Sequence, residues 1–357
     1  MCTNLCYMKR NLRKNLIRAT AGIIIIAMLA TTVAGFFMMG AQPKPISVSA
    51  TGAYSSAKAM CTIDINSGRI LYTKNADAQI PMASTTKIVT AITTIELAQE
   101  QGICLDEKIV INDKAIGIEG TSIYLQKGEQ LSIRELLYGL MLRSGNDASM
   151  ALALAVCKTN EEFCAKMQEV SQRVGAINSN YKNPHGLDEE GHYTTAYDLA
   201  LITAYAMKNP VFAEIVKTKE IRIDGKEYPR ILQNKNRLLR QLDGCVGVKT
   251  GFTKKAGRCF VGARDYNGMT VVCVVLNCGP MFEESADIMK QADAEFTMRR
   301  LVGENQFIGD MQAIGMQDFY YPLTDAEMDG IATYIEGSEV VVKLGEREIH
   351  RALCNVL

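Results

Sequence analysis

A late pair of apolar stretches constrains the fold more than any other feature of this chain. Residues 258–264 and 269–276 have the composition of strands, and Asn267 and Gly268 lie between them. Asn-Gly between two apolar runs is the strongest short signal for a tight hairpin. The two stretches therefore predict an antiparallel strand pair late in the chain.

Strand patterns also occur early, and helical patterns fill the space between. Residues 59–65 and 69–73 predict a first hairpin around the turn at 66–68. Helices are predicted between the two hairpins, one of them opened by a capping box at Ser132 and Glu135; their ranges are 84–101, 132–141, 148–156, 161–174 and 195–207. Strands at both ends with helices between predict an α+β fold. Its antiparallel sheet is assembled from distant parts of the chain and flanked by helices, with a helical insertion.

Ser84 and Lys87 stand three residues apart where one helical pattern begins, just before Ile88, Ile92 and Ile95. A helix that begins near Ser84 places both side chains one turn apart and aims its free N–H groups at whatever reacts there. A serine hydroxyl needs a base, and a lysine can be that base only if burial or another cation lowers its pKa. An N-cap serine followed by a surface lysine has the same pattern, so the motif needs partners.

Two further motifs supply candidate partners. Ser144-x-Asn146 lies in a short polar turn between two helical stretches and offers a hydroxyl and an amide. The triplet that begins at Lys249 reads Lys-Thr-Gly and follows a short strand-like run. Lys249 is the second cation that a neutral Lys87 requires. Each triplet is common alone, but the ordered set is that of penicillin-binding proteins and class A β-lactamases, whose middle element is Ser-Asp-Asn.

With these motifs, the chain resembles the low-molecular-mass penicillin-binding proteins that are serine-type D-alanyl-D-alanine carboxypeptidases. Residues 64–72 are similar to that family's opening hairpin, and residues 183–188 to the loop between its second and third motifs. Residues 248–253 are similar to its sporulation-type, Gram-positive branch. The resemblance implies a DD-peptidase/β-lactamase-like fold in residues 55–300, followed by a partial small β-rich C-terminal domain in residues 301–357.

The resemblance implies acyl transfer on peptidoglycan stem peptides that end in D-Ala-D-Ala, with β-lactam antibiotics as covalent inhibitors. Ser84 is then the nucleophile and Lys87 its general base. Ser144 relays protons toward the leaving amine, and Asn146 holds Lys87 and the substrate amide. No cofactor is implied. A metal site is poorly supported, because the chain has three histidines and no Cys-x-x-Cys pair.

The third motif is expected to bind the substrate. The resemblance implies that Lys249 supplies positive potential for the substrate carboxylate and keeps Lys87 neutral, while Thr250 hydrogen-bonds that carboxylate. The backbone N–H groups of Ser84 and Phe252 form the oxyanion hole, where each donor is typically worth roughly 3 kcal/mol. Gly251 lets another backbone approach closely.

Some residues depart from the family pattern or invite another reading. The family commonly has an arginine after the second strand of the late hairpin, but residues 279–284 contain none. Arg143 or Arg258 is expected to substitute. His185 lies in the family-like loop, where Pro-His-Gly favours a rigid turn over a catalytic histidine. His192 and His350 are expected to be solvated.

The N-terminal 50 residues differ from the rest. They hold six basic residues and no acidic one, although the whole chain balances 39 basic against 39 acidic residues. An uncharged stretch at 19–39 follows this basic region and predicts either a signal peptide or a membrane anchor. Both predict export to the outer face of the cell membrane or the cell wall. Nothing in the charge pattern indicates a nucleic-acid partner.

Nine cysteines follow residue 50, an odd number, so at least one thiol is free. Such a thiol-rich exported chain fits a Gram-positive anaerobe. If Asn267 and Gly268 are the central turn residues of the late hairpin, Cys273 faces Gly262. Cys259 then lies three rungs from Cys273, about 10 Å along the strands. A disulfide needs Cα atoms within about 7 Å, so no bond between these two cysteines is expected.

Three functions from different classes remain open at this point. The first is an active carboxypeptidase. The second is a β-lactamase on the same fold, for which the class A loop Glu-x-x-Leu-Asn is absent from the sequence. The third is a catalytically silent wall-binding or sensor protein, against which the presence of every expected catalytic side chain argues.

Overall fold

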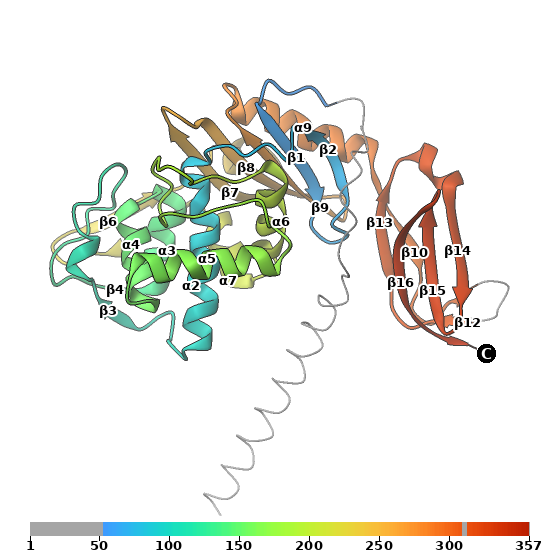
Figure 1. Cartoon of the computed structure of the whole chain (residues 1–357), viewed down its shortest axis with the longest axis horizontal. Helices are drawn as coiled ribbons and strands as arrows, with labels where there is room; N and C mark the ends of the chain where they lie inside the picture. Colours follow the sequence, from blue (N-terminus) through green and yellow to red (C-terminus); the bar gives the residue numbers. More distant parts are fainter. Residues whose placement is uncertain (1–52, 309–312, 357) are drawn as a thin grey trace, which may run out of the picture. The chain divides into compact units, whose positions relative to one another are not determined.

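The computed structural model describes residues 53–308 and 313–356, and it has the α+β architecture expected from the sequence (Figure 1). Its main sheet is antiparallel and has the strand order β2-β1-β9-β8-β7. The first hairpin thus pairs with the late one, as predicted. The five strands are β1 (Ala59–Asp64), β2 (Ile70–Lys74), β7 (Cys245–Thr253), β8 (Gly257–Tyr266) and β9 (Met269–Leu276).

Both faces of the sheet are covered, which explains why β9 is apolar except at Thr270. Val272 and Val274 face a core shared with helices α2 (Lys87–Glu100) and α6 (Ala196–Met207). Cys273 and its odd-numbered neighbours face a second core shared with α9 (Met281–Glu295). Alternate side chains of a strand point to opposite faces, and burying each apolar side chain contributes about 1.5–3 kcal/mol.

The helical region lies between the strands of the main sheet in sequence, as predicted (Figure 1). Local signals begin several helices: Ser132 and Glu135 form the expected capping box, and Thr195 caps α6 through the Asp198 N–H. The remaining helical elements are η1 (Ala83–Thr86), η2 (Asp113–Ala115), α3 (Ile133–Tyr138), the π-helical turn η3 (Gly139–Arg143), α4 (Asn146–Val156), α5 (Asn160–Arg173), α7 (Pro210–Lys217) and α8 (Leu238–Gln241).

Two small hairpins accompany the helices, and the sequence analysis missed both. The first pairs β3 (Lys108–Val110) with β4 (Gln130–Ser132), and the second pairs β5 (Glu220–Asp224) with β6 (Pro229–Gln233). The strands of both hairpins are short, so their periodicity is weak.

The last part of the chain is rich in strands. One sheet has the order β11-β12-β16-β15-β14, and β10 pairs with β13. The apolar run within Glu339–Leu344 has a strand-like composition and forms β15. The bounds of these elements are β10 (Thr297–Val302), β11 (Phe307–Ile308), β12 (Ala313–Gly315), β13 (Phe319–Leu323), the 3₁₀ turn η4 (Asp325–Gly330), β14 (Ile331–Glu336), β15 (Glu339–Leu344) and β16 (Arg347–Val356).

The signal or anchor expected in residues 1–50 lies outside the described residues. Within them, no single helix is long and apolar enough to cross a membrane; α6 and α7 meet that criterion only as a pair bent by 104°.

The late hairpin has the predicted register. Tyr266 pairs with Met269, and Gly262 pairs with Cys273. Cys259 belongs to the core on the α2 face of the sheet, whereas Cys273 belongs to the core on the α9 face. All nine cysteines of the described residues are free.

We therefore predict no disulfide between Cys259 and Cys273, because opposite faces and the separation along the ladder keep the two thiols apart. Mass spectrometry of a non-reduced digest, compared with a reduced one, checks this. A cross-linked peptide that joins the two cysteines would show that the register of the late strands is wrong.

Candidate active site

Ser84 lies in the one-turn 3₁₀ helix η1, which leads directly into α2. The predicted helix start is confirmed, although its first turn is 3₁₀. The preceding residue, Ala83, has a positive φ of 48°. Gly186 packs against this turn so closely that a Cβ there would lie 2.0 Å from the Ala83 carbonyl oxygen. The loop at 183–188 therefore supports the backbone that presents Ser84.

Lys87 is fully buried, and its amine has three hydrogen-bonding neighbours. Nζ lies 3.0 Å from Ser84 Oγ, 2.7 Å from Asn146 Oδ1 and 2.6 Å from the His185 carbonyl oxygen. A neutral amine has two N–H donors and one lone pair. Two of its neighbours here can only accept, while the Ser84 hydroxyl can donate. The geometry thus suits a neutral Lys87 that receives the Ser84 proton.

The charges around Lys87 also favour its neutral form. Burial lowers the pKa of Lys87 well below its usual range, and the positive charges of Lys249 and Lys235 lower it further. The negative charge of Asp147 opposes them. Lys249 therefore acts on Lys87 in the direction expected from the sequence. Lys235 is an additional cation that the sequence analysis did not identify.

The Lys-Thr-Gly motif lies on β7, against the Ser84 turn. A Cβ on Gly251 would lie 3.1 Å from the backbone nitrogens of both Ser84 and Thr85, so glycine permits this close approach. Lys249 is buried, and its Nζ donates to the Thr250 carbonyl oxygen at 2.9 Å. Burial, and then the charge of Lys235, lower the pKa of Lys249 to about 7.

The middle motif connects the π-helical turn η3 to α4. Ser144 has a left-handed backbone (φ 67°), and Asn146 begins α4. Both residues are buried. Asn146 contacts Lys87 directly, as stated above. Within the described part of the chain, the Ser144 hydroxyl makes no hydrogen bond, so the structure brings Ser144 to the buried turn without joining it to the other motif side chains.

The loop at 183–188 contributes more than its sequence indicated. The His185 carbonyl, not its ring, contacts Lys87. The His185 ring accepts a hydrogen bond from the nearby Leu187 N–H, and burial first of all lowers its pKa to about 3. The expectation of a rigid turn rather than a catalytic histidine agrees with these contacts. Asp188 accepts a hydrogen bond from Thr253 at 2.8 Å, so the loop also contacts the end of β7.

The expectation that His192 is solvated is wrong. Its ring is buried, with Nδ1 accepting from the Lys182 N–H at 3.0 Å and Nε2 lying 2.9 Å from Thr86 Oγ1. His192 therefore supports the turn that carries Ser84. His350 is also not fully solvated, since its ring stacks on Phe319 with centroids 3.9 Å apart.

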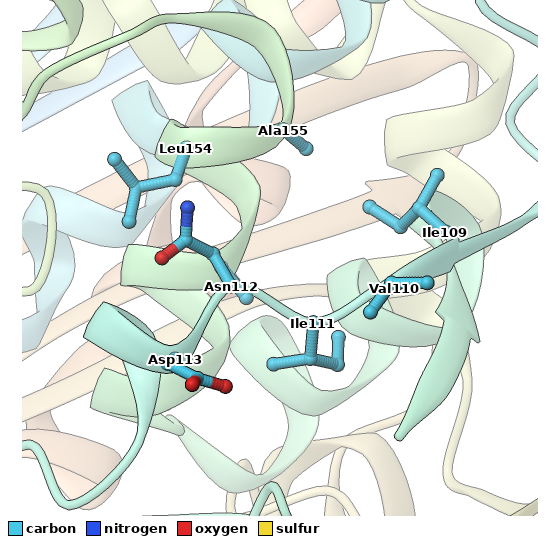
Figure 2. Close-up of a pocket in the computed structure, with 8 residues that line it drawn as sticks. Ile109, Val110, Ile111, Asn112, Asp113, Leu154 and Ala155 are labelled. Carbon is cyan, nitrogen blue, oxygen red and sulfur yellow. The ribbon is translucent and has the colours of Figure 1, made fainter. Parts of the chain in front are cut away.

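A separate pocket of about 410 Å³ lies between the β3 segment and α4 (Figure 2). Ile109, Val110 and Leu154 give it apolar walls, and Asn112 and Asp113 form part of its lining. None of the motif residues lines this pocket. The chemistry described above is therefore located elsewhere, at the junction of η1, α4 and β7.

Comparison with known proteins identifies the family of the chain. The sequence model of peptidase family S11, D-alanyl-D-alanine carboxypeptidase, matches residues 46–279. The chain belongs to this family. These carboxypeptidases are serine peptidases that act on peptidoglycan through an acyl-enzyme and bind penicillin, and the chain is accordingly a hydrolase of the extracytoplasmic cell wall.

Among carboxypeptidases of this family, DacF of Bacillus subtilis is 31% identical to the chain over 281 residues, which cover 78% of the chain and 72% of DacF. The enzyme of Streptomyces sp. K15 is 32% identical over 298 residues, covering 79% of the chain and 99% of the relative. Penicillin-binding protein 5 of Haemophilus influenzae has the same fold, with a TM-score of 0.75, 24% identity and coverage of 86% and 98%.

We predict that Lys249→Ala moves the acid limb of the pH–rate profile for penicillin acylation to higher pH. Removing the like charge makes protonated Lys87 less unfavourable, so the pKa of Lys87 rises and less neutral amine is present at a given pH. Stopped-flow acylation between pH 5 and 10 measures the limb. Lys255→Ala is the matched control. It also removes one positive charge, but from an exposed lysine in the turn between β7 and β8. A limb that stays in place or moves to lower pH contradicts the role of Lys249.

Proposed function

We propose that Ser84 is the nucleophile with which this carboxypeptidase removes the terminal D-alanine of stem pentapeptides. One observation carries the proposal: the buried Lys87 amine lies 3.0 Å from Ser84 Oγ, and its other two neighbours are carbonyl oxygens. An activated nucleophile needs a base within hydrogen-bond reach and a third group that orients the base. Asn146 and the His185 carbonyl orient Lys87.

In the first step, Ser84 Oγ attacks the carbonyl carbon between the two D-alanines and its proton passes to Lys87. The negative charge that forms on the carbonyl oxygen is stabilised by the backbone N–H groups of Ser84 and Phe252. Collapse of this intermediate breaks the C–N bond, and the leaving amine takes the proton, relayed through Ser144. Water then attacks the ester carbonyl carbon and passes a proton to Lys87. Breakage of the bond between this carbon and Ser84 Oγ releases the shortened peptide with a free carboxyl group, and the proton returns from Lys87 to Oγ.

The free carboxylate of the substrate needs a cation, because the family's usual arginine is absent from residues 279–284. We propose that Lys249, Thr250 and Lys235 bind it together. The charge of Lys235 lowers the pKa of both Lys249 and Lys87, which supports a place for Lys235 close to the site. Of the two arginines expected to substitute, Arg258 instead donates to the Gly279 carbonyl at 3.1 Å. Arg143 acts on Lys235, whose pKa is lowered mainly by burial and then by Arg143.

Beyond its extracytoplasmic place, we propose that residues 1–50 export the enzyme or hold it at the membrane of a Gram-positive anaerobe. The basic start and the uncharged stretch at 19–39 support this. The number of thiols in the exported part supports an environment with little oxygen.

We predict that Ser84→Ala abolishes both covalent labelling by a fluorescent penicillin and release of D-alanine from a pentapeptide. The fold should persist, because the Ser84 hydroxyl contacts Lys87 and does not cap η1 or α2. Ser67→Ala, which alters a turn serine bonded to Asp64, is a control for serine loss elsewhere. Thermal unfolding of each variant checks the fold, and a covalent adduct on the alanine variant would exclude Ser84 as the nucleophile.

The same assays separate the alternatives. A β-lactamase turns over the penicillin rapidly and releases no D-alanine, whereas a silent wall-binding protein does neither. The proposed carboxypeptidase retains the penicillin label and releases D-alanine.

A further inference from the structure

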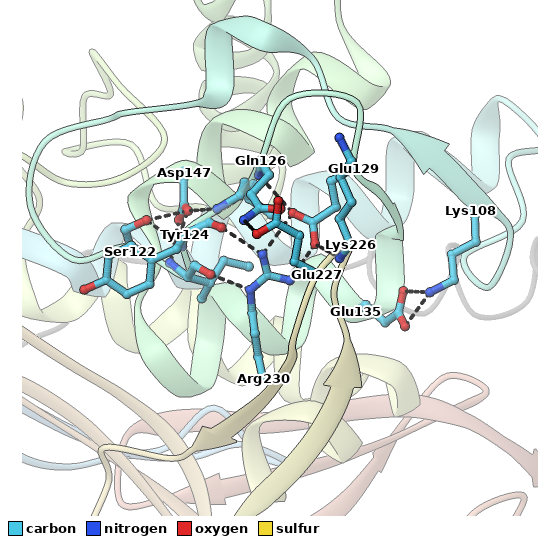
Figure 3. A network of polar contacts seen from close by, with 12 residues as sticks. Lys108, Ser122, Tyr124, Gln126, Glu129, Glu135, Asp147, Lys226, Glu227 and Arg230 are labelled. Carbon is cyan, nitrogen blue, oxygen red and sulfur yellow. Dashed lines mark hydrogen bonds and ion pairs between the residues drawn. The ribbon is translucent and has the colours of Figure 1, made fainter.

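A buried carboxylate lies next to the middle motif and binds a separate segment of the chain. Asp147, the second residue of α4, is almost fully buried. It accepts hydrogen bonds from Ser122 Oγ at 2.6 Å and from the Ile123 and Leu125 N–H groups at 3.0 Å (Figure 3). Asp147 therefore fixes the backbone of residues 122–125 to the first turn of α4.

An arginine binds the same segment through its carbonyl groups. Arg230, on β6, donates from Nε to the Ile123 carbonyl at 2.6 Å and from Nη2 to the Tyr124 carbonyl at 2.8 Å. Its guanidinium also pairs with Glu129 at 2.6 Å, and the Glu129 side chain is fully buried. Asp147 and Arg230 thus hold the N–H and C=O groups of one short segment (Figure 3).

The segment is held in a conformation that it would not favour alone. Tyr124 has a φ of 61°, in the left-handed region, which costs roughly 1–2 kcal/mol for a residue with a side chain. Tyr124 is 79% exposed, so packing of its side chain does not compensate for this cost. The backbone is fixed by the hydrogen bonds that Asp147 accepts and Arg230 donates, together with one from the Tyr124 N–H to Ser122 Oγ at 2.7 Å.

The residues just before this segment contact Asn146. The Thr121 carbonyl accepts the Asn146 backbone N–H at 2.7 Å, and the Glu119 carbonyl accepts Asn146 Nδ2 at 2.6 Å. Between them, Gly120 (φ 91°) lies so close that a Cβ there would be 2.7 Å from Nδ2. Because Nδ2 donates to Glu119, the other end of the amide, Oδ1, must face Lys87.

We propose that Asp147 and Arg230 are positioning residues of the active site, acting through residues 119–125 to make Asn146 present Oδ1, rather than Nδ2, to Lys87. This inference rests on the proposed function. If residues 119–125 loosen, the Asn146 side-chain amide can rotate and turn its N–H groups toward Lys87. The Lys87 amine then loses the acceptor that Oδ1 provides. The reactive pair of Ser84 and Lys87 then loses its orientation.

The first test is Arg230→Lys, which keeps a positive charge beside Glu129 but lacks the planar fork that reaches both carbonyls. We expect the rate constant of penicillin acylation to fall about tenfold or more, since small misplacements near reacting groups have large kinetic effects. Arg69→Lys is the matched control, because Arg69 also pairs with a glutamate, Glu327, and donates to a main-chain carbonyl, that of Pro322. The control should acylate at the wild-type rate.

The second test is Asp147→Asn, read out by pH. The charged groups that act on Lys87 are Lys249, Lys235 and Asp147, and the negative charge of Asp147 raises the pKa of Lys87. Its removal should slow acylation and move the acid limb to lower pH, opposite to the effect of Lys249→Ala. A limb that stays in place would show that the charge of Asp147 does not act on Lys87, and acylation at the wild-type rate would contradict the positioning role. Gly120→Ala, which pushes on the Asn146 amide directly, should slow acylation without moving the limb in that direction.

A readout independent of activity is the Asn146 side-chain amide in ¹⁵N NMR spectra. In the wild type the protons of this amide should exchange slowly with solvent. In Arg230→Lys we expect exchange to be faster by about tenfold or more, because opening of residues 119–125 exposes the amide. If amide exchange and acylation in Arg230→Lys and Asp147→Asn are as fast as in the wild type, the inference is overturned. Ser84 would remain the proposed nucleophile. If the wild type is not acylated at all, the proposed function fails, and amide exchange alone decides whether the two residues position Asn146.

Discussion

The proposed active site depends on one buried amine. Lys87 has no contact with solvent, and its three hydrogen-bonding neighbours are two carbonyl oxygens and the Ser84 hydroxyl. An ammonium at this position would lose its hydration and face Lys249, so the neutral form is favoured. A neutral lysine that has already used both N–H groups has its lone pair free for the serine proton. Burial thus gives a residue type that is ordinarily a charged surface group the protonation state that our proposal requires of a base.

The rest of the structure keeps these atoms together. A sheet buried on both faces provides β7 as a rigid support, and glycine at position 251 lets this strand approach the Ser84 turn. Gly186 lets the loop at 183–188 pack against the same turn from another direction. Each of the three neighbours of Lys87 comes from a different part of the chain. The site therefore forms only when the whole catalytic fold has formed.

Features set by local sequence could be predicted. The Asn267-Gly268 turn predicted the register of β8 and β9 correctly. The register in turn predicted which residues lie opposite Cys259 and Cys273. The motifs beginning at Ser84, Ser144 and Lys249 predicted the candidate site, and the structure brings residues of all three motifs together at the Ser84 turn or the Lys87 amine. Features set by long-range packing could not be predicted. His192 was expected in solvent because its burial depends on Thr86, 106 residues earlier. The contact between the His185 carbonyl and Lys87 could not be predicted, because every residue type has this carbonyl. The same is true of the carbonyl groups that Arg230 binds.

The central claim is that Lys87 is neutral when the enzyme reacts. NMR of protein labelled at the lysine Cε and Nζ atoms measures this directly, with Lys87→Arg to assign the signal. We predict that Lys87 titrates well below the ordinary lysine value of 10.5, and that the amine is neutral throughout the pH range of rapid acylation. A Lys87 pKa at or above 10.5 in the folded, active enzyme would contradict its role as the base.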